Sequence, residues 1–120
     1  MSAPLDVKER PVGSVTVLAV AGRLVIDDGE RVLKERVTSL VAAGRVKILL
    51  DLRNVRFIDS SGVGALASLL IHVVAREGRL KLLSPSARVD QVLRMTHVLH
   101  AFEIFDDESA AVASFDIIDG

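Results

Sequence analysis

The amino-acid sequence predicts an α/β fold, in which one small mixed β-sheet packs against about four α-helices. Apolar runs rich in β-branched residues alternate along the chain with segments that carry apolar residues at helical spacing. Half of the residues are hydrophobic but only 3% are aromatic, so the core must be aliphatic, which suits a sheet covered by helices. The expected order β-β-α-β-α-β-α-β-α contains strand–helix–strand units, which imply parallel pairing with right-handed crossovers.

The first two strands are expected to form an antiparallel hairpin. Residues 5–10 alternate in polarity, and Pro11 and Gly13 then turn the chain. Residues 15–20 are β-rich and mostly apolar, and Gly22 ends this run. The short connection between the two runs predicts that they pair with each other.

A helix, a buried strand and a second helix are expected next. Residues 27–29 are a polar helix start, and apolar residues then recur at helical spacing until Gly44, which fits a C-cap. Residues 46–52 are apolar apart from two charged side chains, which predicts a central strand. The second helix is expected over residues 61–76 and stops at Gly78.

Two further strands and two further helices complete the expected order. Residues 80–83 form a third apolar run, which Ser-Pro closes, and residues 87–97 carry the apolar spacing of a helix. Residues 102–105 fit a short edge strand, and the acidic segment after them fits the cap of a last helix over residues 110–115.

Composition limits the class of protein. A chain of 120 residues is expected to be a single domain over residues 1–120. The net charge is −1, no run of basic residues occurs and there is no Trp or Tyr, so nucleic-acid binding is not expected. There is no cysteine and no signal-peptide pattern at the start, and the longest apolar stretch, residues 63–75, is too short to cross a bilayer. We therefore expect a cytoplasmic protein without membrane insertion.

Residues 57–64, Phe-Ile-Asp-Ser-Ser-Gly-Val-Gly, are the most informative segment. They form an acidic, hydroxyl-rich turn between the expected buried strand and the second helix, and two glycines occupy the first helical turn. Each glycine costs a helix about 1 kcal/mol relative to alanine, and the free N–H groups of a helix start suit close approach by another group. The structural alternative is that Asp59 or Ser60 is simply an N-cap, although no capping box follows.

Enzymatic and cofactor-binding interpretations find less support. Residues 62–67 fit the dinucleotide pattern G-x-G-x-x-A, but residues 82–84, where the pattern needs an acid, read Leu-Leu-Ser. The hydrolase pattern G-x-S-x-G is absent, because Asp59 stands two residues before Ser61. No metal-ligand spacing involves the histidines, for which solvated or core-edge positions are expected: His72, His97 and His100. The sequence therefore predicts neither a catalytic site nor a cofactor or metal.

Residues 50–52, Leu-Asp-Leu, together with residues 57–64 resemble the signature of STAS domains, the family of anti-sigma factor antagonists and of related domains in sulfate transporters. The expected order of elements also matches the STAS fold, from about residue 5 to residue 115. The resemblance implies that the first serine after the aspartate, Ser60, is phosphorylated by a partner anti-sigma factor with a kinase fold. ATP would bind to that partner, and the chain itself would not be an enzyme.

The resemblance also implies a partner-binding surface around the turn. In the family, an aspartate often follows Gly-x-Leu at the end of the second strand, whereas Val25 stands there in this chain. Asp27 and Asp28 either substitute for that aspartate or cap the first helix. The implied partner-binding residues are Asp59, Ser60, Ser61, Gly62, Val63 and Gly64, with Asp27 and Asp28.

Several functional questions stay open at this level. A STAS scaffold in a signalling complex and a cytoplasmic STAS subunit of a transporter would carry the same turn, and a small nucleotide-binding protein is a more distant alternative. A homodimer is compatible with the sequence. The helix over residues 65–75 is apolar on most faces, so it is either well buried or extends a docking patch; exposure of Leu66, Leu70 or Ile71 would favour docking.

Overall fold

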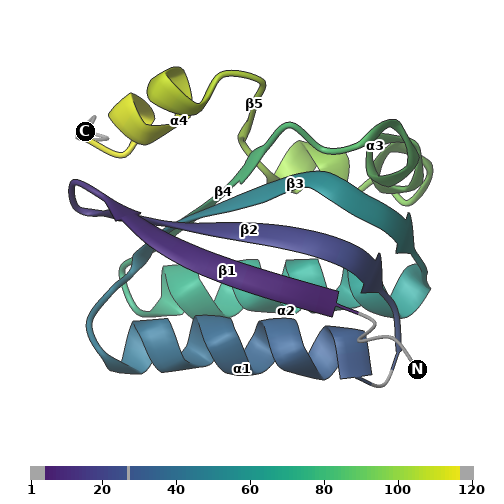
Figure 1. Cartoon of the computed structure of the whole chain (residues 1–120), viewed down its shortest axis with the longest axis horizontal. Coiled ribbons are helices and arrows are strands. Elements are labelled where there is room, and N and C mark those ends of the chain that lie inside the picture. The colour runs from purple at the N-terminus through teal and green to yellow at the C-terminus, as the bar shows by residue number, and fades with distance from the viewer. Residues whose placement is uncertain (1–4, 27, 117–120) are drawn as a thin grey trace.

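The computed structural model describes residues 5–26 and 28–116, and a five-stranded sheet lies at its centre (Figure 1). β1 pairs antiparallel with β2, and all the later strands pair in parallel. The strands lie side by side in chain order: β1 Leu5–Val12, β2 Val15–Leu24, β3 Lys47–Ile58, β4 Arg79–Leu83 and β5 Ile104–Phe105. The expected mixed sheet, a hairpin followed by parallel strands, is confirmed.

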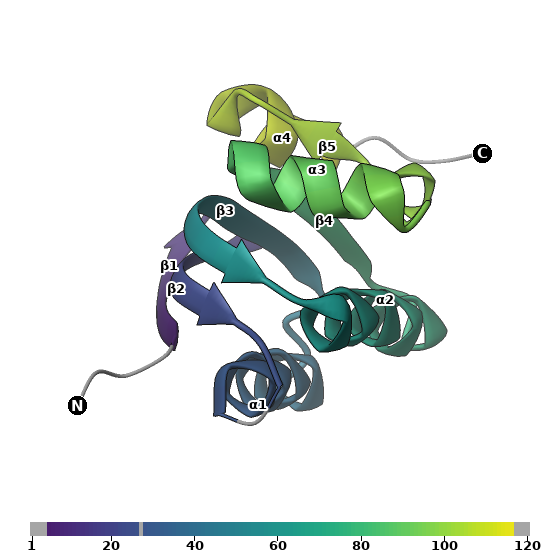
Figure 2. The same cartoon turned by 90° about the vertical axis from the view of Figure 1, so that its right-hand side faces the viewer.

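Helices cover both faces of this sheet (Figure 2). Two of them, α1 and α2, lie on one face, and the two later ones, α3 and α4, lie on the other. Their bounds are α1 Asp28–Ala42, α2 Ser60–Ala75, α3 Ala87–Met95 and α4 Glu108–Ser114, with a short 3-10 helix at Leu99–Ala101 that the sequence did not predict. The predicted order of strands and α-helices is therefore confirmed.

The hairpin is longer than expected. β1 continues through Pro11 to Val12, and the turn is made by Gly13, with φ +62°, and Ser14. Pro11 was expected to lie in the turn with Gly13, but it belongs to the strand although it lacks an N–H group. It is tolerated because β1 is the edge strand and needs partners on one side only.

β3 is also longer than expected. Two irregularities interrupt its alternating pattern, so the sequence did not reveal the second half of the strand. From Ala19 to Ala21, β2 advances by two residues while β3 advances by three, from Asp51 to Asn54. A second extra residue enters β3 one step further along, next to Arg23 of β2. Such bulges break the two-residue alternation of a strand. The buried residues of this part of β3 accordingly recur every third position: Leu52, Val55 and Ile58.

Two aliphatic cores hold the layers together. The larger one joins the sheet to the first three helices and includes Leu18 of β2, Leu50 of β3, Leu33 of α1, Leu66 of α2 and Leu93 of α3, all fully buried. The smaller one lies under α4 on the opposite face. Its buried members are Val15, Val17, Leu49, Leu83, Ala111 and Phe115. An aliphatic core between sheet and helices is what the low aromatic content predicted.

Lys81 fastens α4 to the sheet. This β4 side chain is 5% exposed, and its ammonium group donates to the backbone oxygen of Ser114 at 3.2 Å and to the hydroxyl of Ser114 at 2.9 Å. The same nitrogen lies 3.4 Å from a carboxylate oxygen of Glu103 and 4.7 Å from the ring centroid of Phe115. A buried charge needs such partners to offset its lost hydration.

Candidate functional site

Asp59 shapes the turn between β3 and α2. It is the N-cap of α2, and its Oδ1 accepts a hydrogen bond from the backbone N–H of Gly62 at 2.9 Å. Its other oxygen, Oδ2, lies 3.3 Å from the backbone nitrogen of Ile26, which follows β2. The carboxylate thus completes the helix start and ties it to the neighbouring loop. Of the two capping residues considered, Asp59 makes the cap.

Ser60 is free to meet another molecule. It is the first residue of α2, and its side chain is exposed. Within residues 5–26 and 28–116, no group forms a hydrogen bond with its hydroxyl, whereas Ser61 beside it is half-buried. The hydroxyl is therefore presented to solvent at the positive end of a helix of 16 residues.

The two glycines of the turn differ in whether the fold requires a glycine at their position. A Cβ added to Gly62 would lie 2.2 Å from the backbone oxygen of Leu24, so this glycine lets α2 pack against the end of β2. A Cβ added to Gly64 would meet nothing within 4 Å, and the residue is exposed. The fold therefore explains Gly62, while Gly64 leaves bare backbone open on the surface. Val63 between them is 4% exposed and packs into the core.

The dinucleotide alternative loses its structural basis. A phosphate cradle needs free backbone N–H groups at the helix start. The N–H of Gly62 donates to the carboxylate of Asp59, and the N–H of Val63 donates to the backbone oxygen of the same residue at 3.0 Å. Both amides are thus already paired within the chain.

The segment after β2, which contains the other expected contact residues, is described only in part. Asp27 falls outside the described residues, and of Asp28 only the backbone, which begins α1, is described. Val25, which stands where the family often has an aspartate, is half-buried, and Ile26 after it is 58% exposed.

The surface next to Ser60 carries arginines that the sequence did not predict as site residues. Phe57, three residues before Ser60, is 38% exposed. The guanidinium carbon of Arg23 lies 4.8 Å from the centroid of its ring, and that of Arg88 lies 5.4 Å from the same centroid. Both distances are within the range of cation–π attraction. Arg23 ends β2 and Arg88 begins α3, so only the folded chain brings them to one ring.

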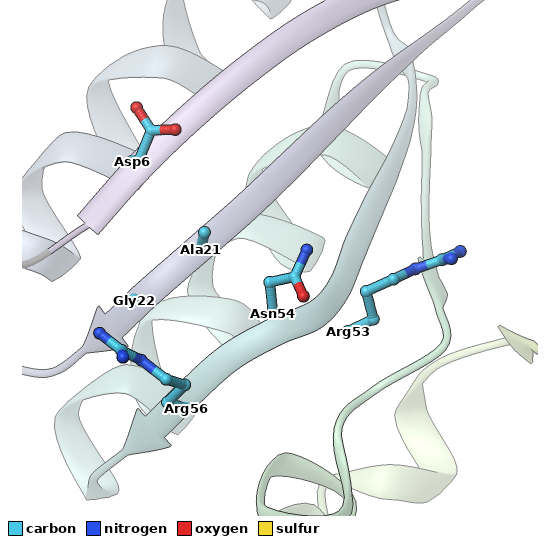
Figure 3. A pocket seen from close by; sticks show the side chains of 6 residues that line it. All are labelled: Asp6, Ala21, Gly22, Arg53, Asn54 and Arg56. Atoms are coloured by element: carbon cyan, nitrogen blue, oxygen red, sulfur yellow. The ribbon is translucent and has the colours of Figure 1, made fainter.

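Two more arginines line a shallow groove over β1, β2 and β3 (Figure 3). Arg53 and Arg56 of β3 project on either side of Asn54, and Ala21 and Gly22 lie across from them on β2. Asp6 of β1 closes the groove. We call the set Arg23, Arg53, Arg56 and Arg88 the arginine surface.

α2 is buried on one side and exposed on the other. Leu66 is fully buried and Leu70 is half-buried, but Ile71 is 70% exposed and Val74 is 50% exposed. Exposure of Ile71 fulfils one condition for a docking patch, and burial of Leu66 shows that the rest of the helix serves the core. Ile71 stands eleven positions after Ser60, about 16 Å along the helix axis.

The histidines lie where they were expected. His72 is half-buried, with its Nδ1 3.2 Å from Nη1 of Arg76, and both His97 and His100 are exposed. Among the described residues, no group of three His, Cys, Asp or Glu side chains could hold a metal ion. In the same part of the chain, no helix is both long and apolar enough to cross a membrane.

Comparison with known proteins identifies the family. The STAS domain family matches residues 7–111, and the chain therefore belongs to this family. A protein of Thermotoga neapolitana, named a putative anti-sigma factor antagonist, is 32% identical over 101 residues, which cover 84% of this chain and 89% of that protein. The resemblance that the turn carried is thus confirmed.

Solved structures agree with this assignment. The crystal structure of a putative anti-sigma factor antagonist from Thermotoga maritima superposes with a TM-score of 0.84 at 27% identity and covers 92% of this chain and 95% of that one. The anti-sigma factor antagonist SpoIIAA in its unphosphorylated form gives a TM-score of 0.78 at 22% identity and covers 95% of this chain and all of that one. At that identity, the likeness to SpoIIAA concerns the fold alone.

Proposed function

We propose that this protein is an anti-sigma factor antagonist that binds an anti-sigma factor serine kinase while Ser60 carries a free hydroxyl. Phosphorylation of Ser60 by that kinase then ends the association, and release of the antagonist lets the kinase hold its sigma factor again. The observation that carries the proposal is the exposed Ser60 hydroxyl, which no described residue binds, at a helix start that Asp59 fixes. The names of the Thermotoga relatives support it.

The proposed switch is a change of charge. The kinase would transfer the γ-phosphoryl group of ATP to Oγ of Ser60, so that an O–P bond forms, the bond to ADP breaks and the hydroxyl proton is released. The phosphate adds a charge of about −1.5 to −2 at neutral pH. The start of α2 favours that charge by about 0.3–1 kcal/mol, so the fold tolerates it. A docked partner would lose contact through bulk, desolvation and repulsion.

Bare backbone at Gly64 supports close docking at the same place. Because a Cβ added to Gly64 would meet no atom of the described residues within 4 Å, a partner could contact the first two turns of α2 directly. In this proposal the protein acts by binding in the cytoplasm, where ATP sits on the partner. The proposed contact residues are Asp59, Ser60, Ser61, Gly62 and Gly64, with Val63 holding the turn from the core side, and Asp27 and Asp28, of which Asp28 begins α1.

The test uses the purified protein with each anti-sigma kinase encoded in the same genome. Incubation with ATP, followed by phosphopeptide mass spectrometry, should place one phosphate on Ser60. Ser60→Ala should remain folded, bind the kinase and take up no phosphate. Transfer to Ser60→Ala at the wild-type rate would show that another residue is the acceptor.

A calorimetric titration then tests the charge switch. Ser60→Glu should bind the kinase more weakly than the wild type does. Ser68→Glu is the matched control, because Ser68 is an exposed serine two turns further along α2 and receives the same charge. Equal affinity of wild type and Ser60→Glu for the kinase would contradict the proposed switch.

A further inference from the structure

We propose that the arginine surface is a docking site for an acidic face of the partner protein. This inference rests on the proposed function and names the chemistry of the partner that the Ser60 site would meet. The surface comprises Arg23, Arg53, Arg56 and Arg88, grouped around Phe57 and the groove over the first three strands.

The two bulges of β3 present this surface. In a regular strand, alternate side chains point to opposite faces, and half of them face the core. Between Leu52 and Ile58, two of every three side chains are exposed instead: Arg53, Asn54, Arg56 and Phe57. Bulges redirect side chains in this way and are frequent beside functional sites. The pairing of β3 with β2 is thus irregular in the segment of β3 that carries Arg53 and Arg56.

Ion pairing does not account for three of these arginines. Among the described residues, no carboxylate pairs with Arg23, Arg56 or Arg88, and all three are exposed. Arg88 also stands in the first turn of α3, where the helix dipole disfavours a positive charge. Arg23 and Arg88 share one aromatic ring, although their like charges repel. Positive charges that lie close together without carboxylate partners destabilise a fold, and such unfavourable arrangements are typical of binding surfaces.

The position of the surface ties it to the Ser60 site. Phe57 and Ser60 are separated by two residues, and Arg23 precedes Leu24, whose backbone oxygen lies against Gly62. A partner that covers Ser60 would therefore reach these arginines in the same encounter. The groove is shallow and open. The four arginines of the surface come from three elements, β2, β3 and α3, and such a spread of cations suits the face of a protein.

Charge complementarity identifies the occupant as acidic. The chain as a whole has 15 basic and 16 acidic residues, so its net charge does not require a basic patch here. Only Arg53 of the four has a described carboxylate partner, Asp51 at 3.1 Å. Phosphorylation of Ser60 would then weaken binding of the partner in a second way. The phosphate's charge of about −1.5 to −2 beside the arginines would cancel their attraction for the acidic partner.

Charge reversal tests the inference, with the anti-sigma kinases of the same genome as probes. Arg56→Glu and Arg88→Glu should each weaken binding of a kinase by about tenfold at low salt, mainly through slower association, and the loss should shrink at high salt. Arg56→Gln should fall between Arg56→Glu and the wild type. Arg45→Glu is the control, because Arg45 is exposed in the turn before β3, at the opposite end of that strand.

The outcomes separate this inference from the proposed function. If Ser60→Glu loses binding while Arg56→Glu and Arg88→Glu bind as Arg45→Glu does, the arginine surface is refuted and the switch stands. If no kinase binds the wild type, both are refuted. A thermal unfolding curve for each variant identifies losses of kinase binding that misfolding causes. If Arg56→Glu misfolds, Arg56→Gln, which removes charge without adding a carboxylate, decides the result: weaker binding than the wild type supports the arginine surface, and equal binding refutes it.

Discussion

Replacing Gly62 by alanine tests how the turn is held. The new Cβ would lie 2.2 Å from the backbone oxygen of Leu24, 2.8 Å from Cγ1 of Ile58 and 3.1 Å from the backbone carbon of Leu24. Carbon and oxygen atoms make weak contact at roughly 3.3 Å, so the closest approach is about 1 Å too short. Since the obstacle is backbone of a paired strand, α2 or the end of β2 would have to move.

The expected loss of stability follows from two opposing effects. Overpacking of a filled site costs typically about 1–3 kcal/mol, and a rigid backbone obstacle favours the upper value. Alanine regains up to about 1 kcal/mol of helix propensity. We therefore expect Gly62→Ala to lower the free energy of unfolding by about 2 kcal/mol. With an unfolding entropy of roughly 2.1 cal/mol/K per residue, the melting temperature should fall by about 8 °C.

Gly64→Ala is the matched control for this effect. It lies one half-turn further along the same helix, and its added Cβ would meet nothing within 4 Å. Only the propensity gain remains, so the melting temperature should rise by up to about 4 °C. If a partner approaches the bare backbone at Gly64, the same variant should be folded and yet bind the kinase more weakly.

Circular dichroism at 222 nm during a thermal ramp measures both variants under one set of conditions. A melting temperature of Gly62→Ala at or above that of the wild type would refute the reasoning, because the contact with Leu24 would then not exist as described. Equal destabilisation by both alanines would refute it as well, since glycine would then be required at both positions for the same reason.

Three other substitutions probe the cap, the core and the fastening of α4. Asp59→Ala removes the acceptor for the N–H groups of Gly62 and Ile26 and should cost about 1 kcal/mol in chemical denaturation, whereas Asp59→Asn should cost less. Leu66→Ala opens the fully buried core and should cost about 2–5 kcal/mol in the same measurement; a loss under 1 kcal/mol would contradict its placement. Lys81→Ala should release α4, seen as faster amide hydrogen exchange there than in α2; unchanged exchange in α4 would show that its apolar contacts suffice.

The turn at residues 57–64 could be recognised from the sequence because its signals are local. An aspartate, serines and glycines between an apolar run and a helical pattern predict a helix start, and the structure places a cap and an exposed hydroxyl there. The order of strands and helices was predictable for the same reason, since each element carries its own periodicity.

Long-range contacts explain what the sequence did not predict. The end of β3 was missed because two bulges replace the alternating pattern by a three-residue one, which no strand rule recognises. The reason for Gly62 lies in Leu24, a contact 38 positions away in the chain. The arginine surface joins residues from 23 to 88 through pairing of β2 with β3 and the return of α3, and no sequence window contains them together.

The two outer strands also bear on how this protein behaves at high concentration. β1 carries Pro11, which has no N–H to offer, and it presents the charged side chains of Asp6, Lys8 and Arg10. β5, at the other border, has only two residues. Extended segments of other chains therefore find few favourable backbone groups with which to pair at the sheet edges, which disfavours amyloid-like growth.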